Sequence, residues 1–383
     1  MQAQEVSDSA QAKSPLFISA QANKGVVLPT NDFVKNEGIS SFSAFSLKFC
    51  VASKGTSWQD FAYGLPYFGV GLYTANFGDT RLGNPLSLFL LQGARIFGNH
   101  SFSFNYEFHL GYSTNWNHYD RFENPHNIAI GSKENIHAAA NVYFSFQPLR
   151  RLNMNIGCGF NHFSNGAMRL PNKGMNLVSP FVELRYVINP LQHSPENTKQ
   201  AFSRPPLEKR IDHDFALTVS SRQITFSRYN TGLGSEYVDY NFRVLGASYA
   251  PLFVNHFAFK WGPSVEIVYD ESGGASARRE LLESDGKYYD RVYLGSVRER
   301  IDAGISAKGE AVMPHFSIFA NFGCEILLGN PNNKRLYQII GVKLPSANGF
   351  FGSFAIRAHR FGKAQFIMWS VGYTLPTQWS TIK

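Results

Sequence analysis

The chain has 383 residues, a formal net charge of +8 and a mean hydropathy of −0.21. It is rich in Phe (34), Tyr (18) and Gly (33), and it contains no uninterrupted apolar run of the roughly 18 residues that a membrane helix needs. This composition is typical of an all-β protein, either soluble or of the outer-membrane kind.

The charge and the cysteines exclude several classes of protein. Lys and Arg are scattered without a basic run, so the sequence does not indicate nucleic-acid binding, and an anionic membrane surface or a phosphorylated lipid fits the charge equally well. Cys50, Cys158 and Cys324 lie far apart without C-x-x-C spacing. We therefore expect no disulfide framework, zinc site or redox centre.

The first residues, 1–14, are polar and lack the apolar core of a signal peptide. If the protein is exported, we expect this sequence to be the mature form from which the signal peptide has already been removed.

Strand-like segments rich in aromatic and β-branched residues recur along the whole chain, and no stretch keeps a helical period. Many reach ten residues, the length that a tilted membrane-spanning strand needs. About sixteen strands are predicted, at 15–28, 41–53, 64–76, 86–98, 100–115, 136–148, 151–164, 175–189, 212–226, 237–252, 255–271, 291–311, 315–329, 335–345, 349–361 and 364–378.

The connections between these segments alternate in length. Short turns such as 98–100, 148–150 and 313–314 are interleaved with longer polar loops such as 116–135 and 272–290. Short turns at one end and long loops at the other are the signature of an antiparallel outer-membrane β-barrel. We therefore expect an all-β, antiparallel transmembrane barrel protein located in the bacterial outer membrane.

One connection is too long and too rich in proline for a turn. The segment 191–211 reads as a linker between two eight-strand halves, 1–190 and 212–383. The halves could close as tandem barrels or jointly as one wide barrel, and the sequence favours the tandem arrangement slightly. A faint echo between 161–166 and 269–273 suggests an internal duplication.

The end of the segment 151–164 carries the strongest chemical signal. Its even-numbered positions are apolar until His162 and Ser164, which continue the same face of the strand. A serine nucleophile and a histidine base are thus within mutual reach. Because the more apolar face of a membrane barrel meets lipid, both side chains should lie on the lipid-facing side.

The next predicted strand supplies a third side chain. Asn176 should lie beside His162 if the two strands form a hairpin. Glu183 projects from the opposite face, so we expect it to be an interior partner of Arg185 and not a catalytic acid.

These residues resemble a known family. The run His162-Phe163-Ser164-Asn165-Gly166, followed by Pro171-Asn172-Lys173-Gly174-Met175, looks like the PagL-type lipid A 3-O-deacylases, eight-stranded outer-membrane barrels that remove an ester-linked acyl chain from lipid A. The resemblance implies that His162 is the general base, Ser164 the nucleophile and Asn165 an oxyanion-hole residue. It covers about residues 15–190 and includes 69–73, 82–85 and 124–135, which look like the longer members of the family, the acyloxyacyl hydrolases.

The chain departs from the family at the third position of the triad, where Asn176 stands in place of a glutamate. An amide oxygen can still orient the imidazole, but it cannot stabilise the imidazolium by charge. Either a carboxylate from a long loop, such as Asp120 or Glu123, supplies the charge, or the enzyme is slow or inactive.

The resemblance implies lipid A or lipopolysaccharide as the substrate, outer-membrane lipid as the surroundings, and no cofactor or metal. Arg169 and Lys173 on the loop between the two strands could receive lipid A phosphates, or they could be ordinary surface charges. Metal binding by His109, His118 and His126 is the weaker interpretation of those residues.

Two functions follow from these observations. The first is an outer-membrane serine esterase that deacylates lipid A, with a second half that is non-catalytic. The alternative is a non-catalytic barrel, either a pore or a lipid-binding pseudoenzyme, that keeps the constellation but has lost the acidic residue. A soluble β-sandwich adhesin fits less well, because the even face of 175–189 is apolar.

Overall fold

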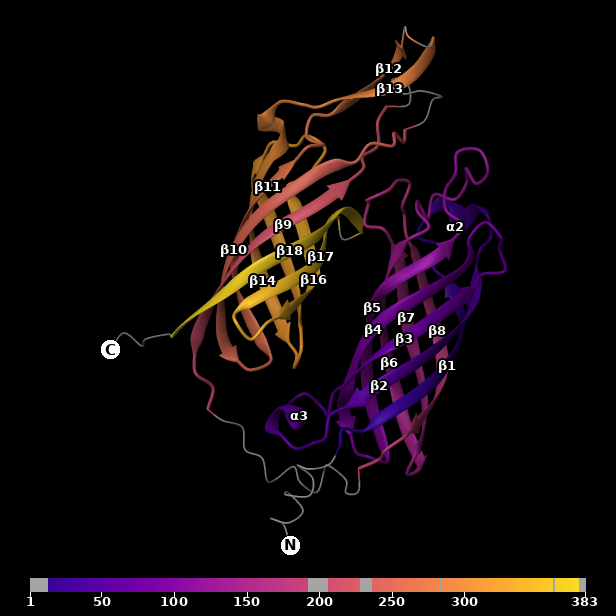
Figure 1. The fold of residues 1–383 in the computed structure, drawn as a ribbon, viewed down its shortest axis with the longest axis vertical. Coiled ribbons are helices and arrows are strands. Elements are labelled where there is room, and N and C mark those ends of the chain that lie inside the picture. Colours follow the sequence, from indigo (N-terminus) through magenta and orange to yellow (C-terminus); the bar gives the residue numbers. More distant parts are fainter. Residues whose placement is uncertain are drawn as a thin grey trace. The chain divides into compact units, whose positions relative to one another are not determined.

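A computed structural model describes residues 13–191, 206–227, 236–282, 284, 286–360 and 362–378. The chain divides into two compact units, Met1–Asn165 with Pro171–Pro205 and Gly166–Leu170 with Pro206–Lys383. Each unit contains one closed antiparallel β-barrel (Figure 1). Most of the predicted linker, residues 192–205, lies outside the described residues.

The first barrel closes by pairing β1 with β8, so its eight strands follow one another around the wall in chain order. Two short helices interrupt its connections, α2 (Asp32–Asn36) and α3 (Trp58–Ala62). Its strands are β1 (Leu16–Val27), β2 (Ser41–Ala52), β3 (Tyr67–Asn76), β4 (Gly83–Gly98), β5 (Phe102–Trp116), β6 (Asn135–Leu149), β7 (Leu152–Ser164) and β8 (Met175–Val187).

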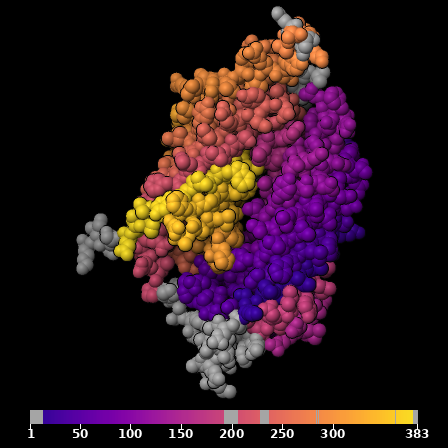
Figure 2. Space-filling view, in the orientation of Figure 1, coloured from indigo at the N-terminus to yellow at the C-terminus, as the bar shows by residue number. Residues whose placement is uncertain are grey.

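Alternation along each strand separates an apolar outer wall from a filled interior. Leu90 and Ile156 on the outside are 67% and 63% exposed, whereas inward-facing Lys48 is 4% exposed. The Lys48 ammonium contacts Glu107 Oε1 at 2.5 Å and Glu183 Oε2 at 2.7 Å. Eight strands leave an interior just wide enough for such side chains to fill. Figure 2 shows the surface of the chain in space-filling form.

The second barrel closes by pairing β18 with β9. Its strands are β9 (Arg210–Arg222), β10 (Phe242–His256), β11 (Phe259–Asp270), β14 (Ile301–Val312), β15 (Ser317–Leu328), β16 (Leu336–Pro345), β17 (Phe350–His359) and β18 (Lys363–Gln378). A separate hairpin of β12 (Ser276–Leu282) and β13 (Lys287–Tyr293), followed by the short η3 (Val297–Arg300), lies between β11 and β14.

The predicted fold class is confirmed: sixteen barrel strands form two eight-strand halves, and the halves close as tandem barrels. The predicted strand 291–311 is wrong in its first part, because residues up to 293 pair with β12 and only Ile301 onward joins the barrel. Among the described residues, no helix has the length and apolar character needed to cross a membrane.

Long loops gather at one end of each barrel, as predicted, with one exception in each. In the first barrel, the connection 53–66 with α3 lies at the short-turn end. In the second, β17 and β18 are joined at the long-loop end by only three residues, 360–362. The echo proposed for a duplication falls on non-equivalent strands, because β7 is the seventh strand of its barrel and β11 is the third.

Candidate active site

The hairpin of β7 and β8 positions the two predicted catalytic side chains. His162 pairs with Asn176 across the hairpin, and Ser164 ends β7. The odd-numbered neighbours Asn161 and Phe163 are buried inside the barrel. His162 and Ser164 therefore lie on the outer wall, at the long-loop end of the first barrel.

Three side chains form a continuous hydrogen-bonded series. Ser164 Oγ lies 3.0 Å from His162 Nε2, and His162 Nδ1 lies 2.7 Å from Asn176 Oδ1. An amide oxygen can only accept, so Nδ1 carries the proton and Nε2 is left as the acceptor for the serine hydroxyl. This is the tautomer that a general base requires.

Thr30, from the loop between β1 and β2, fixes the orientation of the Asn176 amide. Asn176 Nδ2 donates to Thr30 Oγ1 at 2.9 Å, and the Thr30 hydroxyl donates to the Leu28 carbonyl at 3.5 Å. The Leu28 N–H in turn donates to the Asn176 carbonyl at 2.8 Å. Thr30 is not among the residues predicted from the sequence, because nothing local marks a residue that lies 146 positions away along the chain.

Gly174 contacts the imidazole from the other side. It has φ +76°, and a Cβ at this position would lie 2.9 Å from His162 Cε1. Only glycine combines this backbone conformation with so close an approach. Asn31, which caps α2 by accepting from the Val34 N–H, also donates to the Gly174 carbonyl at 3.1 Å. The sequence signal for Gly174 was its place in the P-N-x-G motif.

Asn165 follows the serine directly and is held by two neighbours. Its side-chain Nδ2 donates to Ser132 Oγ at 2.9 Å, and its backbone N–H donates to Asn172 Oδ1 at 3.3 Å. These contacts hold Asn165 directly after Ser164 and engage both its backbone N–H and its side-chain amide.

Neither of the suggested replacement carboxylates, Asp120 or Glu123, is a hydrogen-bond partner of His162 in the described residues. Asp120 Oδ1 accepts the backbone N–H groups of Phe122 and Glu123 and so closes its own turn. In the part of the chain that the structure describes, His162 has no carboxylate partner. The expected role of Glu183 is confirmed, because Arg185 Nη2 lies 3.1 Å from Glu183 Oε1 inside the barrel.

The structure places the proposed phosphate-binding residues and the three histidines in different parts of the first barrel. Arg169 and Lys173 are exposed on the β7–β8 loop. His109 Nε2 lies 2.7 Å from Glu107 Oε1 in the barrel interior, away from the loop that holds His118 and His126.

The described part of the second barrel has no loop equivalent to the one between β7 and β8. Residues 360–362 alone separate β17 from β18, whereas residues 165–174 separate β7 from β8. Asp270, at the end of β11, is buried and accepts from Arg222 Nη1 at 2.9 Å and Asn330 Nδ2 at 3.1 Å. It is therefore part of an internal ion pair.

The fold and the site together define a tandem β-barrel protein with a Ser-His-Asn series on the outer wall of its first barrel. Residues 211–379 match the family model described as "Acyloxyacyl hydrolase, C-terminal domain". The predicted resemblance to this PagL-type family is thereby confirmed. The match lies in the second barrel, whereas the motifs that carried the resemblance lie in the first.

Solved structures add only weak likenesses. The outer membrane enzyme PagL is 17% identical, with 44% of this chain and 97% of that chain covered and a TM-score of 0.29. The siderophore receptor PirA from Pseudomonas aeruginosa is 8% identical, with 95% and 81% covered and a TM-score of 0.27. At such TM-scores neither bears on what this chain does. No curated protein matches the sequence.

Proposed function

We propose that this protein is an outer-membrane carboxylic ester hydrolase that removes an ester-linked acyl chain from lipid A. The observation that carries the proposal is the hydrogen-bonded series from Ser164 through His162 to Asn176 on the outer wall of the first barrel. The Ser164 side chain projects away from the barrel interior but is only 8% exposed, so an acylated lipid would have to reach it from the outer side of the wall. The acyloxyacyl hydrolase domain in the second barrel supports the same class of reaction.

The first barrel carries the chemistry in this proposal. As Ser164 Oγ attacks the ester carbonyl carbon, His162 Nε2 takes the hydroxyl proton. Asn165 exchanges its contact with Asn172 or Ser132 for a hydrogen bond to the oxyanion that develops. The intermediate collapses, His162 returns the proton to the leaving sugar oxygen, and an acyl-serine remains. Water then attacks the acyl-serine with His162 again as base, and a 3-hydroxy fatty acid leaves.

The outer wall and the site loop supply the substrate contacts. Below the site, the outward-facing Cys158, Pro180 and Val182 are exposed, and they suit the acyl chains of a lipid better than water. The exposed Arg169 and Lys173 would receive the phosphates of lipid A. The second barrel takes no direct part in the reaction.

Release of fatty acid from lipid A, followed by mass spectrometry, tests the proposal. The full chain should release a 3-hydroxy fatty acid, and Ser164→Ala should lower the rate by about a thousandfold or more, because the nucleophile is lost. Ser101→Ala, in an exposed turn at the opposite end of the same barrel, should leave the rate unchanged. Full activity in Ser164→Ala would show that the nucleophile is wrong.

One observation favours a second function, a non-catalytic lipid-binding barrel. The partner of His162 Nδ1 is the neutral Asn176, so the imidazolium lacks a compensating charge. In that case the intact chain would bind lipid A vesicles without releasing fatty acid.

A further inference from the structure

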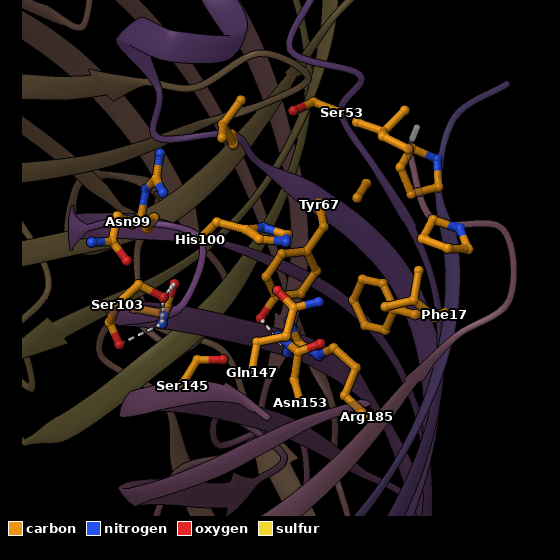
Figure 3. A pocket seen from close by; sticks show the side chains of 18 of the residues that line it. Phe17, Ser53, Tyr67, Asn99, His100, Ser103, Ser145, Gln147, Asn153 and Arg185 are labelled. Atoms are coloured by element: carbon orange, nitrogen blue, oxygen red, sulfur yellow. Dashed lines mark hydrogen bonds between the residues drawn. The ribbon is translucent and has the colours of Figure 1, made fainter. Parts of the chain in front are cut away.

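The first barrel contains a cavity at its short-turn end, the end opposite to the Ser-His-Asn series. Its volume is about 380 Å³, within the range of small-molecule sites. The strands' ends and their turns line it, together with the segments that precede β1 and follow β8. Figure 3 shows Phe17, Ser53, Gln147 and Arg185 around this cavity.

The connection that carries α3 builds one wall of the cavity. A capping box of Ser57 and Asp60 starts this helix, and Gly64 ends the segment with φ +74°. The Gly64 carbonyl accepts the Arg95 N–H at 2.9 Å, and a Cβ on Gly64 would overlap the Arg95 carbonyl. The segment is thus tied to β4, and it brings Ser53 and Leu65 to the cavity.

Three buried polar atoms of residues that line the cavity have no hydrogen-bond partner in the described part of the chain: Ser53 Oγ, Gln147 Oε1 and Arg185 Nε. Unpaired buried groups cost free energy, so a bound molecule that pairs with them would be stabilised. The Gln147 amide cannot simply rotate, because its Nε2 donates to the Arg150 carbonyl at 3.1 Å. An occupant that pairs with both groups would donate to Gln147 Oε1 and accept from Arg185 Nε.

The positively charged side chains that line the cavity favour an anionic ligand. Arg95, Arg150 and Arg185 line the cavity with His100, and no Asp or Glu occurs among its described lining residues. Arg185 already pairs with Glu183 through Nη2, which leaves its Nε as the unused donor. Guanidinium groups suit carboxylate oxygens. Phe17 and Leu65 add an apolar part to the wall.

We propose that this cavity is a second binding site that takes a small hydroxylated carboxylate, such as a sugar acid. The carboxylate would accept from Arg185 and meet the charge of Arg150, and a hydroxyl group would donate to Gln147. The site is independent of the esterase reaction, because it lies at the other end of the barrel.

Isothermal titration of the full-length protein in an uncharged detergent tests the site, with D-glucuronate as the probe. Glucose has the hydroxyl groups without the carboxylate, and acetate has the carboxylate without the hydroxyl groups. Glucuronate should bind at least about tenfold more tightly than either, since each lacks one set of charge-assisted or neutral hydrogen bonds. Equal affinity for all three, or no binding of glucuronate, would overturn the proposal.

Two adjacent arginines give a matched pair of variants. Both Arg150 and Arg151 are exposed, but only Arg150 lines the cavity. Arg150→Gln should weaken glucuronate binding about tenfold, and Arg151→Gln should leave it unchanged. Gln147→Leu, which removes the unpaired acceptor, should also weaken it, with folding checked by circular dichroism. Equal weakening by the two arginine variants would mean that glucuronate responds only to the overall surface charge, and the proposed site would be wrong.

Discussion

At the scale of single residues, the proposed reaction depends on the side chains that orient His162. The imidazole is oriented by Asn176 Oδ1, and Thr30 in turn orients the amide. The hydrogen bonds that the proposed triad needs are therefore present among Ser164, His162 and Asn176, while a negative charge is missing. Two substitutions separate the contribution of charge from the contribution of geometry.

Asn176→Asp restores the charge with almost no change in shape. In serine proteases, the reverse change from Asp to Asn lowers the rate by about ten-thousandfold. We expect Asn176→Asp to raise the rate of lipid A deacylation by about tenfold or more, because the carboxylate stabilises the imidazolium. The measurement is fatty-acid release under single-turnover conditions. A lower rate in a normally folded Asn176→Asp variant would contradict the prediction. It would mean that the surrounding groups require the neutral amide at position 176.

Thr30→Val removes the hydroxyl that accepts from Asn176 and keeps the size of the side chain. The amide is then free to rotate and present its NH₂ group to His162, which would select the wrong tautomer. We expect kcat to fall by about tenfold with little change in KM. Thr30→Ser, which keeps the hydroxyl, should restore most of the rate, and equal losses in both variants would point to packing alone.

At the scale of elements, the long loops of the first barrel are tied together at the end of the barrel that carries the site. Arg81, in the loop after β3, donates to Glu37 near α2 and contacts Asp79 Oδ2 at 2.6 Å. The Arg81 carbonyl also accepts the amides of Asn124 and Asn127 from the loop after β5. This side chain and its carbonyl thereby join three loops.

Arg81→Met should loosen these loops and leave the barrel intact. Such partly exposed ion pairs contribute only about 0 to 1 kcal/mol, so the midpoint of thermal unfolding should hardly change. Hydrogen–deuterium exchange should become faster in residues 32–37 and 77–82. The control is Lys35→Met, which removes a positive charge from α2 but leaves Arg81 in place. Unchanged exchange in Arg81→Met would contradict this role.

The ion pair between Arg81 and Asp79 should hold the loops only above a certain pH. Hydrogen bonds from Arg81 lower the pKa of Asp79 below its usual value. A carboxylate whose pKa is lowered on folding stabilises the fold above its unfolded pKa, and this contribution is lost as the pH falls through the folded pKa. The loops should therefore stay ordered at pH 5.

At the scale of the whole molecule, stability rests on charges buried inside the barrels. Lys48 is the cation between Glu107 and Glu183, and its loss would leave two buried carboxylates close together. Breaking a buried pair by removing one partner costs about 3–5 kcal/mol. Lys48→Met should therefore lower the urea midpoint of the full chain strongly, whereas Lys24→Met on the exposed face of β1 should not.

The sequence by itself determined the all-β class, because alternation of apolar and polar residues is a local property that each strand carries on its own. It also located His162, Ser164 and Asn176, since the two strands that hold them are neighbours in the chain. The break inside the predicted strand 291–311 could not be predicted. Residues up to 293 pair with β12 and residues from 301 pair with β11, and both parts consist of similar strand-forming residues.

Only the tertiary structure decided what depends on closure of the barrels. Whether sixteen strands form one barrel or two rests on the pairing of β1 with β8 and of β18 with β9, which lie far apart in the sequence. The contact of Thr30 with Asn176 and the cavity at the short-turn end also depend on closure of the first barrel. They arise because closure brings together loops and turns whose residues carry no mark of their partners, whereas the hairpin that holds the serine and histidine is local.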